Sequence, residues 1–466
     1  CLNDCAIIYF LFSSKILYKR ISSRINKRVS NRIVIIGAGS TNFGLGIVGD
    51  FFKSKILSGS TLVLHDINSE TLKNTHEIAL SFKEKLGVDF NIESTTSRSK
   101  ALQQADFCLI SIEVGNRFEL WEQDWKVPLQ YGIKQVYGEN GGPGGMFHAM
   151  RQVPVIIEIC EDIEKICPEA FVFSYSNPMQ RICHALNTRF PNLKITGLCH
   201  EIASMTRQLP SLMETDIDNI EFEAGGLNHL SILLSAKYKD SDKDGYPSIN
   251  KNFEDYYSDL VNDHEGFFSN PGAERGLFFE LFKRYGYLPI TTDSHLGEYL
   301  SWAYSVVDHD GILDFYDKYK KRCLSFFSND GYEKFFDMSH PKPHERAIPI
   351  IESIVADLNM LEHAVNIRNN NFIECLPKDI VVEVPAIINK TGIHGRKLEN
   401  YPESFGSLLN SQVGTIQLTT KAILNKSKET AIHALLADPL VENPNSVTSL
   451  IDTMIAFQKE YLGYLQ

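Results

Sequence analysis

The residues whose side chains are best suited to catalysis or metal binding lie in three short segments near the middle of the chain. The segment GLCHE (197–201) combines a thiol, an imidazole and a carboxylate; Asn177 precedes it, and His229 follows it. A thiolate and an imidazole together hold borderline divalent metals. Neither Cys199 nor His229 belongs to a CxxC or HExxH pair, so their spacing alone does not indicate a zinc site, and a single Cys or His on a loop is more often structural.

A glycine-rich turn near the start of the chain has the features of a dinucleotide site. The strand-like segment RIVII (32–36) ends at Gly37, and Gly39 and Ser40 lead into residues 43–52, whose apolar spacing is helical. Glycines let the backbone approach a pyrophosphate, which the helix N-terminus also favours. Asp66, at the end of the next strand-like run, is expected to accept a hydrogen bond from a ribose hydroxyl, which favours NAD over NADP.

This turn departs from the GxGxxG pattern in two respects. Asn42 stands in place of the third glycine, with Gly44 two residues later, and Asp66 follows Gly39 by 27 residues instead of about 20. A turn in an α/β domain that binds no nucleotide therefore stays open as an alternative. The run GGPGG (141–145) is read as a loop beside the cofactor or as a plain hinge.

The elements that must position these residues follow an α/β pattern up to about residue 200. Strand-like runs at 32–36, 61–64, 105–112, 170–175 and 193–197 alternate with helical segments, which predicts a Rossmann-like, doubly wound parallel sheet over residues 31–200. The carboxyl ends of such strands face one ligand crevice. Gly37, Glu113, Asn177 and Cys199 should therefore converge there, with Glu113 on the cofactor side.

Beyond residue 200 the pattern changes to that of a second, α+β domain over 201–466, expected to carry the substrate, metal and oligomerisation surfaces. Antiparallel strands are predicted at 220–224 and 230–236, and a further strand at 379–389. Helices are predicted at 278–304, 311–327, 412–424 and 430–436.

Composition excludes several classes of function. The formal net charge of the 466 residues is −12 and no basic face stands out, so nucleic-acid binding is not expected. No apolar run reaches the ~18–20 residues of a membrane span. Nine scattered cysteines, an odd number, are typical of a reducing compartment, which predicts a cytoplasmic protein. Residues 1–30, apolar and then basic, are read as a leader or upstream extension.

At the residues described above the sequence resembles glycoside hydrolase family 4, the NAD- and divalent-metal-dependent glycosidases. The matching segments, in the family's order, are IVIIGAGST (33–41), SNPM (176–179), GLCHE (197–201), GGLNHLS (225–231) and LPKDIVVEVPAIINKTGIHG (376–395). The resemblance implies NAD+ and a metal, usually Mn2+, held by Cys199 and His229. It further implies that Asn177 and His200 contact the sugar, and that the protein is a homodimer or homotetramer.

The family reaction implied by this resemblance differs from two-carboxylate glycoside hydrolysis. It proceeds by oxidation at C3, loss of the C2 proton with elimination at C1, addition of water, and re-reduction. The segment 288–299 resembles the part of the family that bears the base, with Asp293 as first choice and Tyr299 as second. His200 replaces an aspartate that serves as acid in other members, and an imidazole can donate a proton near neutral pH.

The motif Cys-His-Glu-Ile (199–202) is similar to the Cys-His-Glu-Val type of α-galacturonidases, which makes an α-D-galacturonide the expected substrate. A uronate requires a nearby cation, and Arg117, Arg151 and Arg181 are the candidates. An α-galactosidase or α-glucosidase of the same family remains an alternative. The two remaining alternatives are a hydroxy-acid dehydrogenase and a non-enzymatic NAD-binding protein.

Overall fold

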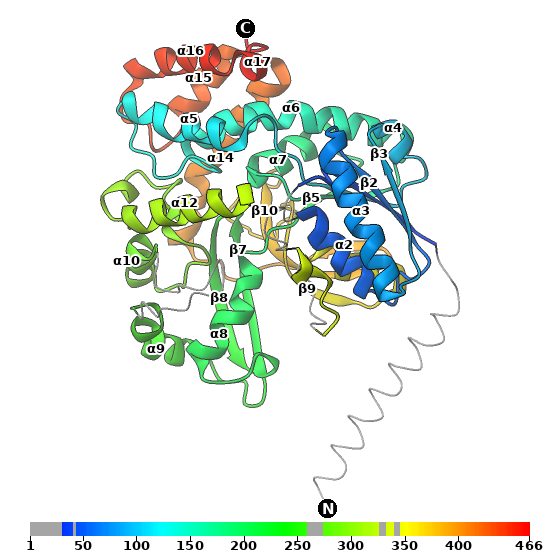
Figure 1. Cartoon of the computed structure of the whole chain (residues 1–466). Coiled ribbons are helices and arrows are strands. Elements are labelled where there is room, and N and C mark those ends of the chain that lie inside the picture. The colour runs from blue at the N-terminus through cyan, green and yellow to red at the C-terminus, as the bar shows by residue number, and fades with distance from the viewer. Residues whose placement is uncertain (1–29, 41–42, 259–273, 326–331, 340–344) are drawn as a thin grey trace, which may run out of the picture.

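One mixed sheet runs through the computed structural model, which describes residues 30–40, 43–258, 274–325, 332–339 and 345–466 (Figure 1). The strands of this 11-stranded sheet follow the order β3-β2-β1-β4-β5-β6-β9-β10-β7-β8, with β11 paired to β10. Their bounds are β1 Arg32–Ile36, β2 Thr61–His65, β3 Asn91–Thr95, β4 Phe107–Ile110, β5 Phe171–Ser174, β6 Lys194–Gly197, β7 Ile220–Leu227, β8 Leu230–Tyr238, β9 Met360–Arg368, β10 Val381–Asn389 and β11 Gly392–Gly395.

The first six strands confirm the Rossmann-like prediction. They are all parallel, and the order 3-2-1-4-5-6 places β1 and β4 side by side, where the connections change direction and a ligand crevice opens. β1, β2, β4 and β5 consist almost wholly of buried apolar residues, as expected for a sheet covered on both faces. The edge strand β3, Asn-Ile-Glu-Ser-Thr, was not predicted because its largely exposed, polar sequence lacks that signal.

The antiparallel strands of the second half confirm the α+β prediction, and they extend the same sheet. β9 joins β6 through the pair Gly197 and Asn366, and β10, β7 and β8 follow in antiparallel register. The domain boundary predicted at residue 200 therefore falls inside a continuous sheet. This continuity places the β7–β8 hairpin near the carboxyl end of β6.

Helices cover both faces of this sheet (Figure 1). In the first half they are α2 Phe43–Lys53, α3 Ser69–Leu86, α4 Arg98–Ala101, α5 Arg117–Gln130, α6 Gly142–Ile166 and α7 Met179–Arg189. In the second half they are α8 Met205–Met213, α9 Tyr246–Ser258, α10 Gly276–Tyr285, α11 Asp293–Leu296, α12 His309–Ser325, α13 Ala347–Ala356, α14 Glu403–Asn425, α15 Lys428–Leu436, α16 Val447–Phe457 and α17 Lys459–Leu462.

Two predicted segments have a different structure. GGPGG (141–145) is no loop: residues 142–145 form the first turn of α6, where a Cβ on Gly145 would lie 2.3 Å from the Asn140 backbone. The glycines there permit close packing. The helix predicted over 278–304 is interrupted after Tyr285, because Gly286 takes a left-handed conformation (φ +74°) that ends α10.

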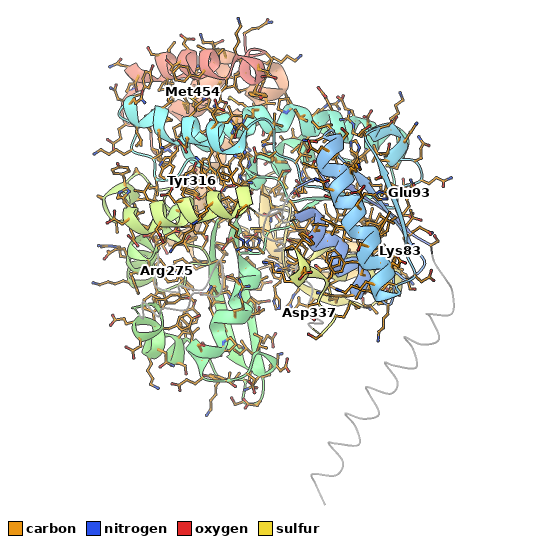
Figure 2. All side chains as sticks on the ribbon, viewed as in Figure 1. Lys83, Glu93, Arg275, Tyr316, Asp337 and Met454 are labelled. Carbon is orange, nitrogen blue, oxygen red and sulfur yellow. The ribbon has the colours of Figure 1, made fainter. Side chains whose placement is uncertain are left out.

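The C-terminal helices pack on the first half of the chain. Buried residues of α14–α17, Met454 among them, share one apolar cluster with α6 and α7, while Tyr316 on α12 belongs to the cluster of the second half (Figure 2). Residues 1–29 of the predicted leader lie outside the described residues. Among the helices that the structure describes, none combines the length and apolar character needed to cross a membrane.

Candidate active site

A pocket at the carboxyl ends of β5 and β6 brings together residues from seven segments of the chain. Its lining residues come from α5, the α5–α6 loop, the ends of β5 and β6, the β7–β8 turn, α11 and α12; they are Arg117, Trp121, Tyr137, Glu139, Tyr175, Asn177, Met179, Leu198, Cys199, His200, Glu201, His229, His295, Phe315 and Tyr319. A second cleft, lined by Glu280, Arg284, Tyr285, Trp302 and Val306, contains none of the predicted site residues.

The end of β6 is shaped so that Cys199 faces this pocket. A Cβ on Gly197 would lie 2.6 Å from the Cys183 sulfur and 2.9 Å from the Asn366 Cβ, so only glycine lets β6, α7 and β9 approach this closely. Cys199 follows two residues later and is buried. The burial, together with the negative charges of Glu383 and Glu201, holds the pKa of the Cys199 thiol well above its usual value.

His229 is held in the pocket by a strained turn. β7 ends at Leu227 and β8 begins at Leu230, so Asn228 and His229 form a two-residue turn in which His229 has φ +80°. A left-handed conformation at a residue other than glycine costs about 1–2 kcal/mol and is concentrated at functional sites. The Asn228 side chain anchors the turn by donating to Glu383 Oε1 at 2.9 Å.

Cys199 and His229, predicted as the metal pair, do meet in the structure. Cys199 Sγ lies 3.4 Å from His229 Nε2 although 30 residues separate them. Burial, and then the nearby His295 and His200, lower the pKa of His229 well below its usual value, so the imidazole is neutral. A neutral imidazole is the form that ligates metals.

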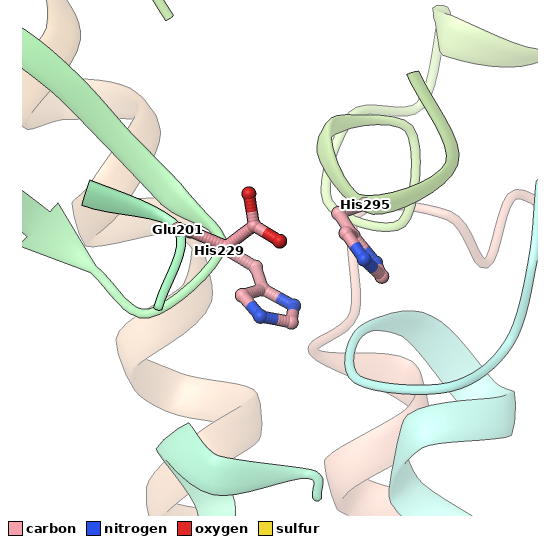
Figure 3. A group of neighbouring side chains, drawn as sticks. All are labelled: Glu201, His229 and His295. Carbon is pink, nitrogen blue, oxygen red and sulfur yellow. The ribbon is translucent and has the colours of Figure 1, made fainter. Parts of the chain in front are cut away.

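Two further residues, which sequence reasoning did not assign to chemistry, complete this cluster. Potential ligand atoms of Glu201, His229 and His295 all lie within 4.8 Å of one another, and Figure 3 shows His295 facing the other two from α11. The available signal for His295 was its position two residues after Asp293 in the segment that resembles the base-bearing part of the family. Glu201 lay within the motif itself.

Asn177, predicted to bind the sugar, lines the pocket beside a small network of charges. Its Nδ2 donates to Glu139 Oε1 at 3.3 Å, and Arg117 Nη2 donates to the same oxygen at 2.9 Å. His200 also lines the pocket, with its side chain 58% exposed and its Nε2 3.9 Å from Glu201 Oε1. Tyr137 is fully buried, and its hydroxyl has no hydrogen-bond partner among the described residues. Neither Glu139 nor Tyr137 was predicted.

The structure does not place the two predicted bases, Asp293 and Tyr299, in the pocket. Both carboxylate oxygens of the fully buried Asp293 accept backbone N–H bonds, from Leu277, Phe278 and Asp308 at 2.9–3.0 Å, so this side chain caps α10. The Tyr299 hydroxyl donates to the Asn228 carbonyl at 3.3 Å. Within the segment 288–299, His295 is the residue that lines the pocket.

The glycine-rich turn has the geometry expected of a dinucleotide site. Gly37 has φ +92°, and a Cβ there would lie 2.0 Å from the Ser111 carbonyl oxygen. The Gly39 N–H donates to Asp66 Oδ2 at 2.8 Å, which joins the two predicted cofactor residues. Ser40 Oγ accepts from the Gly44 N–H at 3.2 Å and so caps the start of α2.

Gly44 explains the departure from the GxGxxG pattern. A Cβ on Gly44 would lie 2.1 Å from the Ala38 carbonyl oxygen, so Gly44 lets α2 approach the turn after β1 closely, as the third glycine of the pattern usually does for helix and strand. Tyr175 links this turn to the pocket, since it lines the pocket while its ring lies 4.3 Å from that of Phe43 at the start of α2.

Glu113, predicted on the cofactor side, is engaged by protein side chains. Its Oε1 lies 3.2 Å from His148 Nε2 and accepts from Gln152, and its Oε2 lies 3.7 Å from Arg117. Burial tends to raise the pKa of Glu113, but His148 and Arg117 outweigh it and hold that pKa below its usual value. Glu113 therefore anchors α5 and α6 to the sheet and is absent from the lining of the pocket.

Known proteins share the sequence of this chain over most of its length. The sequence matches the family 4 glycosyl hydrolase profile over residues 32–215 and its C-terminal domain over 224–441. It is 44% identical to an α-glucosidase of Erwinia rhapontici, covering 94% of this chain and 100% of the relative. It is 30% identical to an α-galacturonidase of Thermoanaerobacterium saccharolyticum, covering 92% and 96%.

Solved structures agree on the fold. A 6-phospho-α-glucosidase from gut microorganisms, in complex with NAD and Mn2+, superposes with a TM-score of 0.77 at 21% identity, covering 92% of this chain and 98% of that one. The matching profiles span most of the chain and the relatives span nearly all of it. The chain belongs to the family 4 glycosyl hydrolases.

Proposed function

We propose that this glycosyl hydrolase uses NAD+ and a divalent metal to cleave neutral α-hexosides, α-glucosides first among them. The single observation that carries the choice of sugar is the neutralisation of Arg117, the one arginine or lysine among the described residues lining the pocket. The name of the Erwinia rhapontici relative, α-glucosidase, supports the same choice. The α-galacturonide expected from the Cys-His-Glu-Ile motif is the alternative.

Each of the three arginines expected to recognise a uronate already has an acidic partner. Arg117 lies 2.9 Å from Glu139 and 3.7 Å from Glu113. Arg151, which is buried, lies 2.6 Å from Asp124, and Arg181, also buried, lies 3.9 Å from Asp438. Glu139 and Glu201 add negative charge to the pocket lining. A substrate carboxylate would therefore find no uncompensated charge on these three arginines, whereas sugar hydroxyls would find acceptors in Glu139 and Glu201.

The residues present fit the implied metal. Cys199 and His229 offer sulfur and nitrogen 3.4 Å apart, where bonds of ~2.3 and ~2.0 Å at about 90–110° would separate the two ligand atoms by roughly 3.0–3.5 Å. The second nitrogen of His229, Nδ1, is buried without a hydrogen-bond partner in the described part of the chain. When bound, such a cation would act as a Lewis acid toward an oxygen of the sugar.

The residues of the chain would then orient the sugar and move protons. Asn177 is held by Glu139 and would direct its amide toward a sugar hydroxyl. His200, which lines the pocket with its side chain 58% exposed, is the proposed proton donor and acceptor, because an imidazole can transfer a proton near neutral pH. The turn 37–40, Asp66 and the start of α2 would hold NAD+ close to Tyr175, on the cofactor side of the pocket.

The test is hydrolysis of p-nitrophenyl α-glucoside, α-galactoside and α-galacturonide by the full chain, with NAD+, Mn2+ and a reductant, and with each omitted in turn. We expect the highest kcat/KM on the α-glucoside and loss of activity without NAD+ or metal. A higher kcat/KM on the galacturonide would refute the choice of sugar. No cleavage of any glycoside, or net accumulation of NADH, would refute the reaction.

A further inference from the structure

We propose that a divalent cation binds this chain in the absence of sugar, on a three-residue set formed by Glu201, His229 and His295. The inference deepens the proposed function, since it concerns the same pocket, and it alters the metal site from the pair Cys199 and His229. It adds a carboxylate and a second imidazole. The set is complete without any hydroxyl of a substrate.

The distances between the three side chains fit one ion. Their potential ligand atoms lie within 4.8 Å of one another, close to twice a metal–nitrogen or metal–oxygen bond of ~2.0–2.2 Å. The rings of His229 and His295 have centroids 4.2 Å apart at 33°. Figure 3 shows Glu201 and His229 on one side of the gap and His295 on the other.

Nitrogen atoms of both imidazoles lack competing partners. Nδ1 of His229 and Nδ1 of His295 are buried, and neither has a hydrogen-bond partner in the part of the chain that the structure describes. The His229 side chain is only 5% exposed. A buried nitrogen without a partner calls for an explanation, and a bound ion is one such explanation.

The backbone holds the three residues in place before any ligand arrives. His229 occupies the strained turn between β7 and β8, and Glu201 lies directly before η1, Ile202–Ser204. His295 sits on the single-turn helix α11, whose first residue Asp293 is fixed by three backbone N–H bonds. The next residue, Ser294, donates its N–H to Glu274 Oε2 at 3.1 Å. Fixed ligands lower the cost of ordering a metal site.

The chemistry of the set also favours the metal class. Carboxylate ligands suit Mn2+ and Mg2+, whereas thiolates select softer ions. Cys199 is 3.4 Å from His229 and lies outside the mutually close set. We therefore assign the first binding of the cation to Glu201, His229 and His295, with Cys199 beside it.

The experiment is a calorimetric titration of Mn2+ into the metal-free full chain, with no sugar and no NAD+ present. Variants are His295→Gln, Glu201→Gln and Cys199→Ser. The controls, His394→Gln on β11 and Glu221→Gln on β7, remove an exposed imidazole and an exposed carboxylate elsewhere. We expect Kd to rise at least about tenfold for His295→Gln and Glu201→Gln, more than for Cys199→Ser, and to stay unchanged for the controls.

A titration with Co2+ gives an independent reading, because a cobalt–thiolate bond produces a charge-transfer band in the near ultraviolet. In the proposed site His295→Gln lowers the Co2+ affinity measured at every absorption band, whereas Cys199→Ser removes any thiolate band and keeps the visible bands of the bound ion. Circular dichroism and the melting temperature identify any variant that fails to fold. If His295→Gln does not fold, Glu201→Gln is compared with Cys199→Ser in its place.

The inference is overturned if His295→Gln and Glu201→Gln both bind Mn2+ within twofold of the parent while Cys199→Ser does not. It is equally overturned if the folded parent binds no Mn2+ until a sugar is added. A parent that binds Mn2+ through His295 but cleaves no glycoside would refute the proposed function alone, since this readout does not depend on hydrolysis.

Discussion

The cofactor turn and the metal pocket lie at neighbouring strand ends, yet they are built in opposite ways. The turn is local: Gly37 and Gly39 lie between β1 and α2, Asp66 directly follows β2, and much of the geometry belongs to the main chain. The pocket is non-local: Cys199, His229 and His295 come from three elements and act through side chains. A short sequence motif can therefore predict the cofactor turn, whereas the metal pocket depends on how distant segments pack.

The largest effect is expected at the residue shared by both metal sets, His229. His229→Ala should lower kcat/KM at least about a hundredfold, because loss of outer partners of a metal alone costs 10–100-fold. NAD+ affinity, measured by fluorescence titration, should change less than twofold, since the turn 37–40 is built from other elements. A comparable loss of NAD+ affinity would mean that the two regions are not separate. His394→Gln is the control for loss of an imidazole.

The matching change on the cofactor side is Gly37→Ala. A Cβ there would meet the Ser111 carbonyl oxygen at 2.0 Å and φ is +92°, so the turn must move. We expect NAD+ affinity to fall about tenfold or more, because the left-handed conformation alone costs about 1–2 kcal/mol, while Mn2+ affinity stays within twofold. Gly87→Ala is the control: Gly87 has φ +63° but no atom within 4 Å of the added Cβ, so NAD+ affinity should not change.

Asp293→Asn separates the capping role of this residue from the predicted role of base. Replacing one oxygen by an amide NH2 leaves at least one buried N–H of Leu277, Phe278 or Asp308 without its acceptor. The free energy of unfolding, measured in urea, should fall by about 1–3 kcal/mol, while kcat per folded molecule changes less than tenfold. A loss of kcat of a hundredfold or more with unchanged stability would restore Asp293 as the base.

The smallest effect on catalysis is expected at Glu345, which lies beside α2 and far along the chain from the metal residues. Burial, with the negative charge of Asp50 nearby, raises the pKa of Glu345 to about 8. Because this folded-state value lies above the ordinary value, the group binds its proton more tightly when folded, and stability is lost as pH rises from about 4.5 to about 8.

Glu345→Gln should remove this pH-dependent loss of stability. The free energy of unfolding changes by about 1.4 kcal/mol for each unit by which the pKa is shifted. The variant should therefore gain stability over the parent between pH 6 and pH 9 in urea denaturation, with kcat unchanged to within a few fold. If the difference in stability between the variant and the parent is the same at pH 6 and at pH 9, the carboxyl group of Glu345 titrates normally. Glu352→Gln on α13, whose pKa is also raised but which bonds to Ser54, is a comparison variant.

The sequence by itself determined the parallel sheet and the glycine turn. Buried apolar runs such as RIVII and the glycines at 37, 39 and 44 are sufficient, because their consequences extend only over neighbouring residues. Cys199, His229 and Asn177 were found from family-like motifs, and the structure brings all three to one pocket. The position of the β7–β8 turn against β6 follows from strand pairing across more than a hundred residues.

Only the tertiary structure decided which residues of the other segments reach the pocket. Asp293 and His295 are two residues apart, and local pattern cannot tell them apart. The position of α10 and Asp308 directs the Asp293 carboxylate to backbone N–H groups, while His295 faces His229. Likewise the sequence alone does not distinguish Arg117, Arg151 and Arg181 as candidates for binding a uronate. The acidic partners Glu139, Asp124 and Asp438, each 22 or more residues from its arginine, decide that none offers an uncompensated charge to a substrate.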